Sequence, residues 1–410
     1  MTSSAHLSRA AIECGLDQFI LDQPFTGTDW QPLYVDAVLK EPERGKRFMS
    51  INTLASVLQS LVAAGWRMGD YPTALEIVKR FFPKIDMLNL DKGRKHLLYY
   101  TADLEKLPEN LKPLEKMAGY SFERKSLLAE AMTHGSDIIA PAAYDRLALL
   151  GSAVLDSQVT TELLSYEKLS HTQMHYYRCA LTNRDYLGFI AMEWSTSQKR
   201  FEMREGPVET TYSLPFWKFM KHASRDVAHE QQKAEERYKG LQHKISKAIR
   251  FDPSYPWALL AELQPNDFFS DIIKAFLGAV WIDSGSMEEC KKVMTGMGIM
   301  RLLERLVRDQ VHAVHPRDEL TQLAGSEEVK LDATARRTAD KETDWVCKVR
   351  VGNRKIVQGI VGRSQDASKT LAADEAVSTL RLEKGILNID LSYSLSMAGS
   401  PKNDTDGSLG

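Results

Sequence analysis

The stretch 144–156, which reads YDRLALLGSAVLD, constrains the fold of this chain more than any other. Its apolar residues recur with helical spacing at Leu147, Leu150, Val154 and Leu155. This pattern predicts an amphipathic helix with one buried stripe. Gly151 has no side chain and lets a neighbouring element come close. On another face, Ala148 and Ser152 lie four residues apart and therefore stack one helical turn apart.

A second constraint is an internal duplication at an offset of 215 residues. Aligning Ala55 with Ser270 also aligns Leu61 with Phe276, Ala64 with Ala279, and Trp66 with Trp281. The same alignment places Ser56 on Asp271 and Gln59 on Lys274. A repeat over so long a distance indicates two copies of one helical domain.

Composition limits the classes of protein that this chain can be. The 410 residues are 43% hydrophobic, enough for two or three domains with real cores. The net charge is −2, so any contact with nucleic acid must come from a local basic patch. The four cysteines stand far apart at Cys14, Cys179, Cys290 and Cys347, which favours buried reduced thiols over a zinc site or disulfides.

The N-terminal part of the chain is expected to be helical. Helical patterns occur at 54–66 and at 74–82, the second ending at Pro83. Residues 84–113 are polar and contain two prolines, which is typical of a linker between domains.

The central part, 114–311, is expected to be a second helical domain. A helix is predicted at 169–194, with Ser170 as its N-cap. Residues 218–250 hold nine Lys or Arg against four Asp or Glu, with apolar residues at helical spacing. We interpret this segment as a basic helical insert, either a solvated face or a phosphate-contacting patch.

The last part of the chain has a different character. Residues 345–351 and 355–361 alternate as strands around a Gly-Asn turn, and a helix closes a module at 315–385. Residues 388–410 are polar and are expected to be a disordered tail. Neither a signal peptide nor a run of eighteen apolar residues occurs, so we expect an intracellular protein of the cytoplasm or nucleus without a membrane segment.

Several motifs together resemble the ribonuclease III family, and in particular the C-terminal part of fungal-type Dicer-like proteins. The stretch 144–156 is similar to that family's signature helix, E-R-L-E-F-L-G-D-A-V-L-D. The supporting motifs are THGSD at 133–137, RCALTN at 178–183, DIIKAFLGAVWIDSG at 271–285 and HPRDEL at 315–320. The resemblance covers nearly the whole chain. It implies a mainly α fold of ribonuclease III helical domains with a small α-β-β-α domain similar to dsRNA-binding domains.

The resemblance also implies where the catalytic residues should lie. In the family, acidic residues on two facing helices hold Mg²⁺ ions that activate water. The corresponding positions are Ala148, Ser152, Asp271 and Lys274 in the second copy, and Ser56 and Gln59 in the first. Asp271 alone keeps a carboxylate, and Lys274 lies one turn away from it. We therefore expect an inactive centre without a metal, and Mg²⁺ or Mn²⁺ at Asp271 only if activity remains.

The terminal module resembles a dsRNA-binding domain whose phosphate contacts are weakened. In that family the last helix begins S-K-K-x-A-K, and the lysines contact phosphates. Residues 364–369 read SQDASK here, so only Lys369 remains. The module holds 13 Lys or Arg against 12 Asp or Glu. Weak dsRNA binding is expected through Lys369, Arg363 and the basic helix of 218–250.

The resemblance further suggests association with another chain. In the family a bulky residue after the first catalytic glutamate plugs a socket in a partner domain, and that residue is Leu149 here. No second signature stretch precedes Met49, so 1–83 is expected to be the C-terminal half of a first ribonuclease III domain. Its apolar faces then predict a homodimer or a Dicer-like partner. The alternative is that 1–83 repacks without a partner.

Three functions are compatible with these observations. The first is a non-catalytic dsRNA-binding or protein-interaction component linked to RNA silencing or RNA processing. The second is an endoribonuclease for double-stranded RNA whose acidic residues are completed by a partner chain. The third is a decaying gene copy without function.

Overall fold

The computed structural model describes residues 3–20, 49–83, 90–99, 106–140, 142–203, 207–337 and 343–385. Two compact units divide the chain, Met1–Gly93 and Arg94–Gly410. Helices dominate both units, and a three-stranded antiparallel sheet follows near the C-terminus. The predicted mainly α fold class is therefore confirmed. The predicted tail, 388–410, lies outside the described residues.

The first unit consists of α1 (Ser4–Glu13), the short helix η1 (Leu16–Phe19) and α3 (Ile51–Phe81). Ser50 caps α3, because its hydroxyl accepts a hydrogen bond from the Thr53 amide at 3.0 Å. The small core of this unit comprises Leu7, Ala10, Ala11, Leu54, Ala55, Leu58 and Phe82. These residues bury one face of α1 against one face of α3.

Helix α3 runs through the region where two separate helices were predicted, and it contains Pro72. A Cβ added to Gly65 would lie 3.5 Å from Ala74 Cα. Nine residues of straight helix would span about 13 Å, so the chain must fold back between these two positions. Pro72 lies in this region and cannot donate the usual backbone hydrogen bond. The two predicted helical segments therefore persist as the two arms of a sharply bent element.

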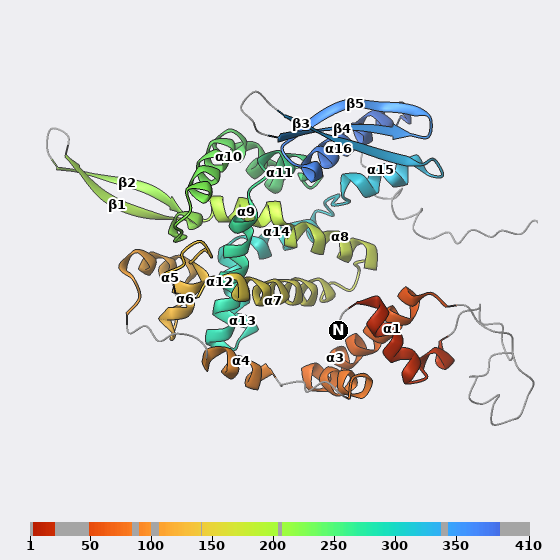
Figure 1. Ribbon diagram of the computed structural model, residues 1–410, viewed down its shortest axis with the longest axis horizontal. Helices are drawn as coiled ribbons and strands as arrows, with labels where there is room; N and C mark the ends of the chain where they lie inside the picture. The colour runs from red at the N-terminus through yellow and green to blue at the C-terminus, as the bar shows by residue number, and fades with distance from the viewer. Residues whose placement is uncertain are drawn as a thin grey trace, which may run out of the picture. The chain divides into compact units, whose positions relative to one another are not determined.

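The second unit contains a body of packed helices, shown in Figure 1. Its elements are α4 (Leu90–Tyr99, which begins at the end of the first unit), η3 (Glu109–Leu111), α5 (Lys112–Ala118), α6 (Lys125–Ala131), α7 (Asp145–Leu164), α8 (His171–Thr182), α9 (Arg184–Glu193), α10 (Arg225–Phe251), α11 (Trp257–Leu263), α12 (Asp267–Ser284), α13 (Met287–Gly296) and α14 (Ile299–Arg308). Helix α12 is buried along most of its length and packs on α7 and α9. It is the centre of the largest hydrophobic core.

Helices α7 and α12 cross at two glycines. A Cβ added to Gly151 would lie 1.7 Å from the Lys274 carbonyl oxygen, and one added to Gly278 would lie 2.2 Å from the Leu147 oxygen. Any side chain at either position would collide with backbone of the other helix. The close neighbour predicted for Gly151 is therefore α12, and the two helices touch backbone to backbone.

Buried polar groups fix the ends of several helices. Asp283 is 7% exposed and accepts hydrogen bonds from the Tyr120 hydroxyl at 2.8 Å and from the Glu123 and Arg124 amides at 2.8 and 2.9 Å. Arg94 donates to the Ile282 and Asp283 carbonyls at the carboxyl end of α12. Arg305 caps α10 by donating to three of its last carbonyls. Such cations satisfy carbonyls that have no partner within the helix.

Two predictions about the central helices need correction. The segment 84–113, predicted as a linker, contains α4, whose Arg94 is fixed to α12. The single helix predicted at 169–194 is two helices. Asn183 interrupts the helix in an extended conformation and caps α9 through its side-chain oxygen. The predicted N-cap Ser170 is confirmed, and it forms a capping box with Gln173.

A two-stranded hairpin precedes the basic helix and was not predicted. Strand β1 (Ser195–Met203) pairs antiparallel with β2 (Pro207–Pro215), and Figure 1 shows the hairpin projecting away from the helices. The 3-10 helix η4 (Phe216–Phe219) follows, with Phe216 completely buried. The basic helix α10 therefore begins at Arg225 and not at 218. Its apolar stripe is buried as expected.

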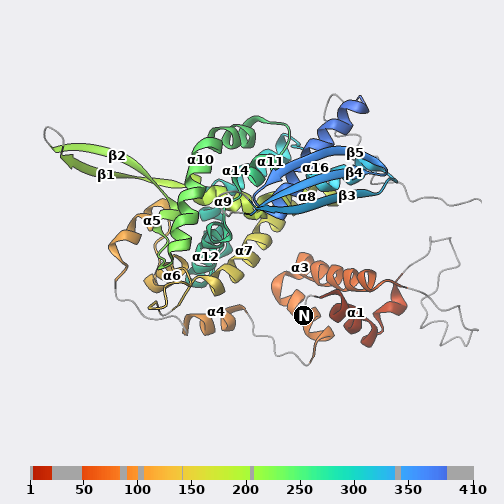
Figure 2. The ribbon, with the colours of Figure 1, turned by 45° about the horizontal axis from the view of Figure 1, so that its top comes forward.

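The terminal module comprises α15 (Pro316–Ala324), β3 (Val329–Arg337), β4 (Thr343–Val351), β5 (Arg354–Gly362) and α16 (Gln365–Glu383). Its sheet has the order β3-β4-β5, and α16 covers one face (Figure 2). The predicted turn is confirmed, with Gly352 at φ +54°. The predicted α-β-β-α order missed β3, in which Val329, Leu331 and Ala333 are only partly buried and the other residues are exposed. The expected apolar stripe of α16 is buried: Ala372, Ala373, Ala376, Val377 and Leu380.

Two smaller expectations concern the cysteines and the membrane. Cys290 and Cys347 are buried, whereas Cys14 is exposed. All four are free thiols. Within the described ranges, no helix has the length and apolarity that a membrane span requires.

Candidate functional site

The positions that the resemblance assigns to metal ligands in the second copy lie on α7 and α12, next to the glycine crossing. On α7, Ala148 is 8% exposed and Ser152 is partly exposed. The Ser152 hydroxyl donates a hydrogen bond to the Ala148 carbonyl at 2.9 Å. The proton of this hydroxyl is therefore engaged within its own helix.

On α12, the remaining carboxylate is paired. Asp271 Oδ1 lies 3.2 Å from Lys274 Nζ, and both side chains are at most 30% exposed. Tyr144 lies near this pair: burial raises the pKa of its hydroxyl, and the charges of Asp271, Asp145 and Asp267 add to this effect. The predicted ion pair between Asp271 and Lys274 is therefore present.

These residues do not fit a divalent metal. Mg²⁺ needs several hard oxygen ligands in octahedral geometry, whereas the site offers a methyl group, a hydroxyl and one carboxylate already bound to an ammonium. In the part of the chain that the structure describes, no group of three His, Cys, Asp or Glu side chains could hold a metal ion. In the first unit, Ser56 and Gln59 are both exposed on α3 and add no carboxylate.

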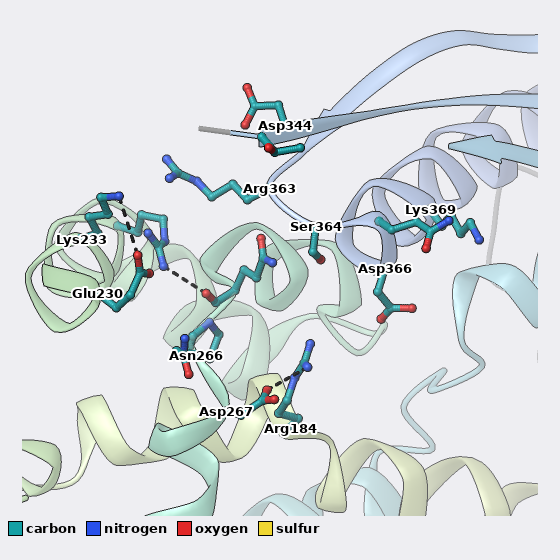
Figure 3. A pocket seen from close by; sticks show the side chains of 15 residues that line it. Arg184, Glu230, Lys233, Asn266, Asp267, Asp344, Arg363, Ser364, Asp366 and Lys369 are labelled. Atoms are coloured by element: carbon teal, nitrogen blue, oxygen red, sulfur yellow. Dashed lines mark hydrogen bonds and ion pairs between the residues drawn. The ribbon is translucent and has the colours of Figure 1, made fainter. Parts of the chain in front are cut away.

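A second candidate site is a cleft of about 620 Å³ between the helical body and the terminal module (Figure 3). It brings together both RNA-binding residues expected in the module, Arg363 and Lys369, with Lys233 and Arg237 of the basic helix α10. Arg184 at the start of α9 is a fifth cation. Four carboxylates also line the cleft, those of Glu230, Asp267, Asp344 and Asp366.

The five cations of the cleft differ in their availability. Arg363 is exposed and Lys369 half-exposed, and in the described ranges neither has an ion pair or a side-chain hydrogen bond. Arg237 donates to the Leu263 and Gln264 carbonyls at 2.9 and 3.0 Å and so caps α11. Lys233 lies 3.7 Å from Glu230. Two cations are therefore free to meet an anion.

Arg184 is surrounded by carboxylates. It lies 2.9 Å from Asp267 and 3.5 Å from Asp185. Burial raises the pKa of Asp185 to about 6, against the opposing charge of Arg184. Neither the composition nor the motifs indicated that Arg184 would line the same cleft as Lys369, because the two residues are 185 positions apart. The only feature of the nearby sequence that could have drawn attention to Arg184 was Asn183, which caps the N-terminus of the helix that Arg184 begins.

The predicted interface residue, Leu149, lies on the outer face of α7. Its side chain is 79% exposed, which is unusual for a leucine in a folded domain. Ala153, one turn further along α7, is also exposed. The position is therefore accessible to another surface, as a plug residue must be.

Comparison with known proteins agrees with this architecture. Residues 145–285 match the ribonuclease III domain family. The chain is 36% identical to "Dicer-like protein 2" of Cryphonectria parasitica over 93% of its length, and 36% identical to "Dicer-like protein 2" of Pyricularia oryzae over 92%. The corresponding protein of Coccidioides immitis is 34% identical over 94% of the chain.

These matches also show how much of each relative the chain represents. It spans 28%, 27% and 28% of the lengths of the three fungal proteins, respectively. The match to the family model begins at the first residue of α7 and ends at the residue that follows α12. Residues 145–285 therefore form a domain of the ribonuclease III family, and the chain is homologous to Dicer-like protein 2 over 93% of its length.

Proposed function

We propose that this chain is a catalytically inactive Dicer-like ribonuclease III homologue that binds double-stranded RNA and acts as a non-catalytic component of RNA silencing. The observation that carries the proposal is the Lys274–Asp271 ion pair at 3.2 Å. An ammonium stands where a divalent cation would need a carboxylate, and Ala148 and Ser152 supply no replacement on the facing helix. The scaffold is retained while the ligands are absent.

The cleft supports the RNA-binding half of the proposal. Phosphate backbones are recognised through Lys and Arg side chains, without regard to base sequence. Arg363, just before α16, and Lys369, in the first turns of α16, line the cleft together with cations of the helical body, and Arg363 extends toward the side that Lys233 lines (Figure 3). An RNA strand in this cleft would contact both the ribonuclease domain and the terminal module.

Charge reversal at Lys369 tests this proposal. Lys369→Glu should weaken binding to a duplex of roughly 20 base pairs by about tenfold near 0.1 M salt, because a phosphate contact is lost. The plot of log affinity against log salt should also become shallower by about one unit. Fluorescence anisotropy with labelled RNA over a salt series measures both quantities.

Lys355→Glu is the matched control. Lys355 is an exposed lysine of the same module, on β5, and it does not line the cleft. It should leave the salt dependence nearly unchanged. Equal losses in the two variants, or a Lys369→Glu protein with the wild-type salt slope, would show that this cleft does not bind RNA.

An active endoribonuclease completed by a partner chain is the alternative, and exposed Leu149 is the observation that favours association. An apolar side chain at 79% exposure gains from burial in a socket. Leu149→Asp should therefore lower the association of the full chain by about tenfold or more, as followed by light scattering over a concentration series. Ala153→Asp serves as the control for a charge elsewhere on the same face. A monomer mass at every concentration for the unmodified chain would remove the case for self-association through Leu149.

A further inference from the structure

The cleft contains carboxylates that compete with any bound anion. Asp267 binds Arg184 at 2.9 Å, and Asp366 binds Arg317 at 2.7 Å. Arg317 donates to the Asp366 carbonyl as well, and to Thr370 Oγ1 at 3.1 Å. Both aspartates lie in the first turns of long helices, α12 and α16, which begin at the cleft.

The two ion pairs belong to one electrostatic network. Burial opposes ionisation of Asp366, yet the hydrogen bond and charge of Arg317, followed by the charge of Arg184, hold the pKa of its carboxyl below the usual range. Arg184 of the helical body therefore acts on Asp366 of the terminal module. The charges alternate along Asp267, Arg184, Asp366 and Arg317, as Figure 3 shows for the first three.

These pairs contribute little to stability, because their aspartates are largely exposed to water. The Asp267 and Asp366 side chains are 65% and 69% exposed. Solvent screens ion pairs of this kind, and many add nothing measurable to folding. Their effect on a ligand is larger, because an arginine that already holds a carboxylate must exchange it before it can hold a phosphate.

We propose that Asp267 and Asp366 are intramolecular counterions that occupy Arg184 and Arg317 and so limit how many RNA phosphates the cleft can bind. This inference rests on the proposed function. The side chains that line the cleft carry five positive and four negative charges. Without the two aspartates the balance would be five to two, and Arg317 beside the cleft would lose its carboxylate partner.

Neutral isosteres test the proposal in the full-length chain. Asp267→Asn and Asp366→Asn should each raise the affinity for a dsRNA of roughly 20 base pairs by about threefold to tenfold, and the double variant by more. The salt slope should steepen by about one unit for Asp366→Asn and by less for Asp267→Asn, because Asp185 still lies 3.5 Å from Arg184. Anisotropy over a salt series measures both, as above. Circular dichroism of each variant checks that the fold is retained.

Asp344→Asn is the matched control. Asp344 lines the same cleft, and in the described part of the chain no ion pair or side-chain hydrogen bond engages its carboxylate. Removing its charge changes the field of the cleft but releases no arginine. An increase in affinity and slope equal to that of Asp366→Asn would overturn the proposal, because general electrostatics would then explain every variant.

A heparin column separates failure of this inference from failure of the proposed function. Elution of Asp267→Asn and Asp366→Asn at higher salt than the unmodified protein and Asp344→Asn supports the counterion role, even if no variant binds dsRNA. In that case the RNA-binding function fails, and the counterion role holds for polyanions other than dsRNA. If the unmodified chain binds dsRNA but the two Asn variants change neither RNA affinity nor heparin elution, the inference fails and the function stands.

Discussion

Replacing Gly151 or Gly278 with alanine is expected to destabilise the chain by at least about 3 kcal/mol. The new methyl group would lie 1.7 Å from the Lys274 oxygen or 2.2 Å from the Leu147 oxygen. Both atoms belong to helical backbone, which cannot rotate away as a side chain can. Relief requires α7 and α12 to separate, and this would open the core around α12.

Urea unfolding followed by circular dichroism measures the effect as a lower midpoint with an unchanged slope. Gly240→Ala is the control. Gly240 lies inside α10, and no atom within 4 Å would meet its added Cβ. Alanine there should stabilise the chain by roughly 0.5–1 kcal/mol through its higher helix propensity. A Gly151→Ala midpoint close to that of the unmodified chain would contradict the backbone contact between α7 and α12.

Incubation with double-stranded RNA and Mg²⁺ or Mn²⁺ is expected to give no cleavage products. A metal pair activates the attacking water and stabilises the leaving oxygen, and removing its ligands removes both effects. Asp271 is the only carboxylate left among the four positions, and Lys274 neutralises it. Gel analysis of labelled duplexes after prolonged incubation is the measurement. Short duplexes with two-nucleotide 3′ overhangs, absent with Asp271→Ala, would contradict the prediction.

A variant with restored carboxylates makes the negative result interpretable. Combining Ala148→Glu, Ser152→Asp and Lys274→Glu places four acidic side chains on α7 and α12. Calorimetric titration with Mn²⁺ should then show binding that the unmodified chain lacks. If the unmodified chain binds Mn²⁺ as tightly as the restored variant, the Asp271–Lys274 ion pair does not exclude the metal. The ion pair then does not explain the absence of cleavage.

The sequence predicted best those elements whose pattern is strong over many residues. The apolar stripe of 144–156 became α7, and the duplicated segment at 265–283 became α12. The N-cap at Ser170 and the Gly352 turn were confirmed, because each depends on residues close together in the chain. Elements with weak patterns were missed: β1 and β2 form a projecting hairpin, and β3 is half-exposed.

The candidate sites were predictable only in part. The family motif located the substituted positions on α7 and α12, and Lys274 lies beside Asp271 because three residues nearly complete a helical turn. Arg184 and Asp366 could not be placed in one cleft from the sequence, because the packing of the terminal module on the helical body brings them together. Charge counts likewise gave no sign that Asp366 would hold Arg317.

The role of Arg237 in capping α11 fixes the position of its side chain. Its guanidinium is held by the Leu263 and Gln264 carbonyls, so its position on the cleft wall is settled when the protein folds. A ligand that approaches this cation need not immobilise it, whereas it must restrict the rotamers of Lys369 on binding. In the proposed RNA complex, Arg237 would be the cation of fixed position, and the more adaptable side chains of the terminal module would adjust to the strand.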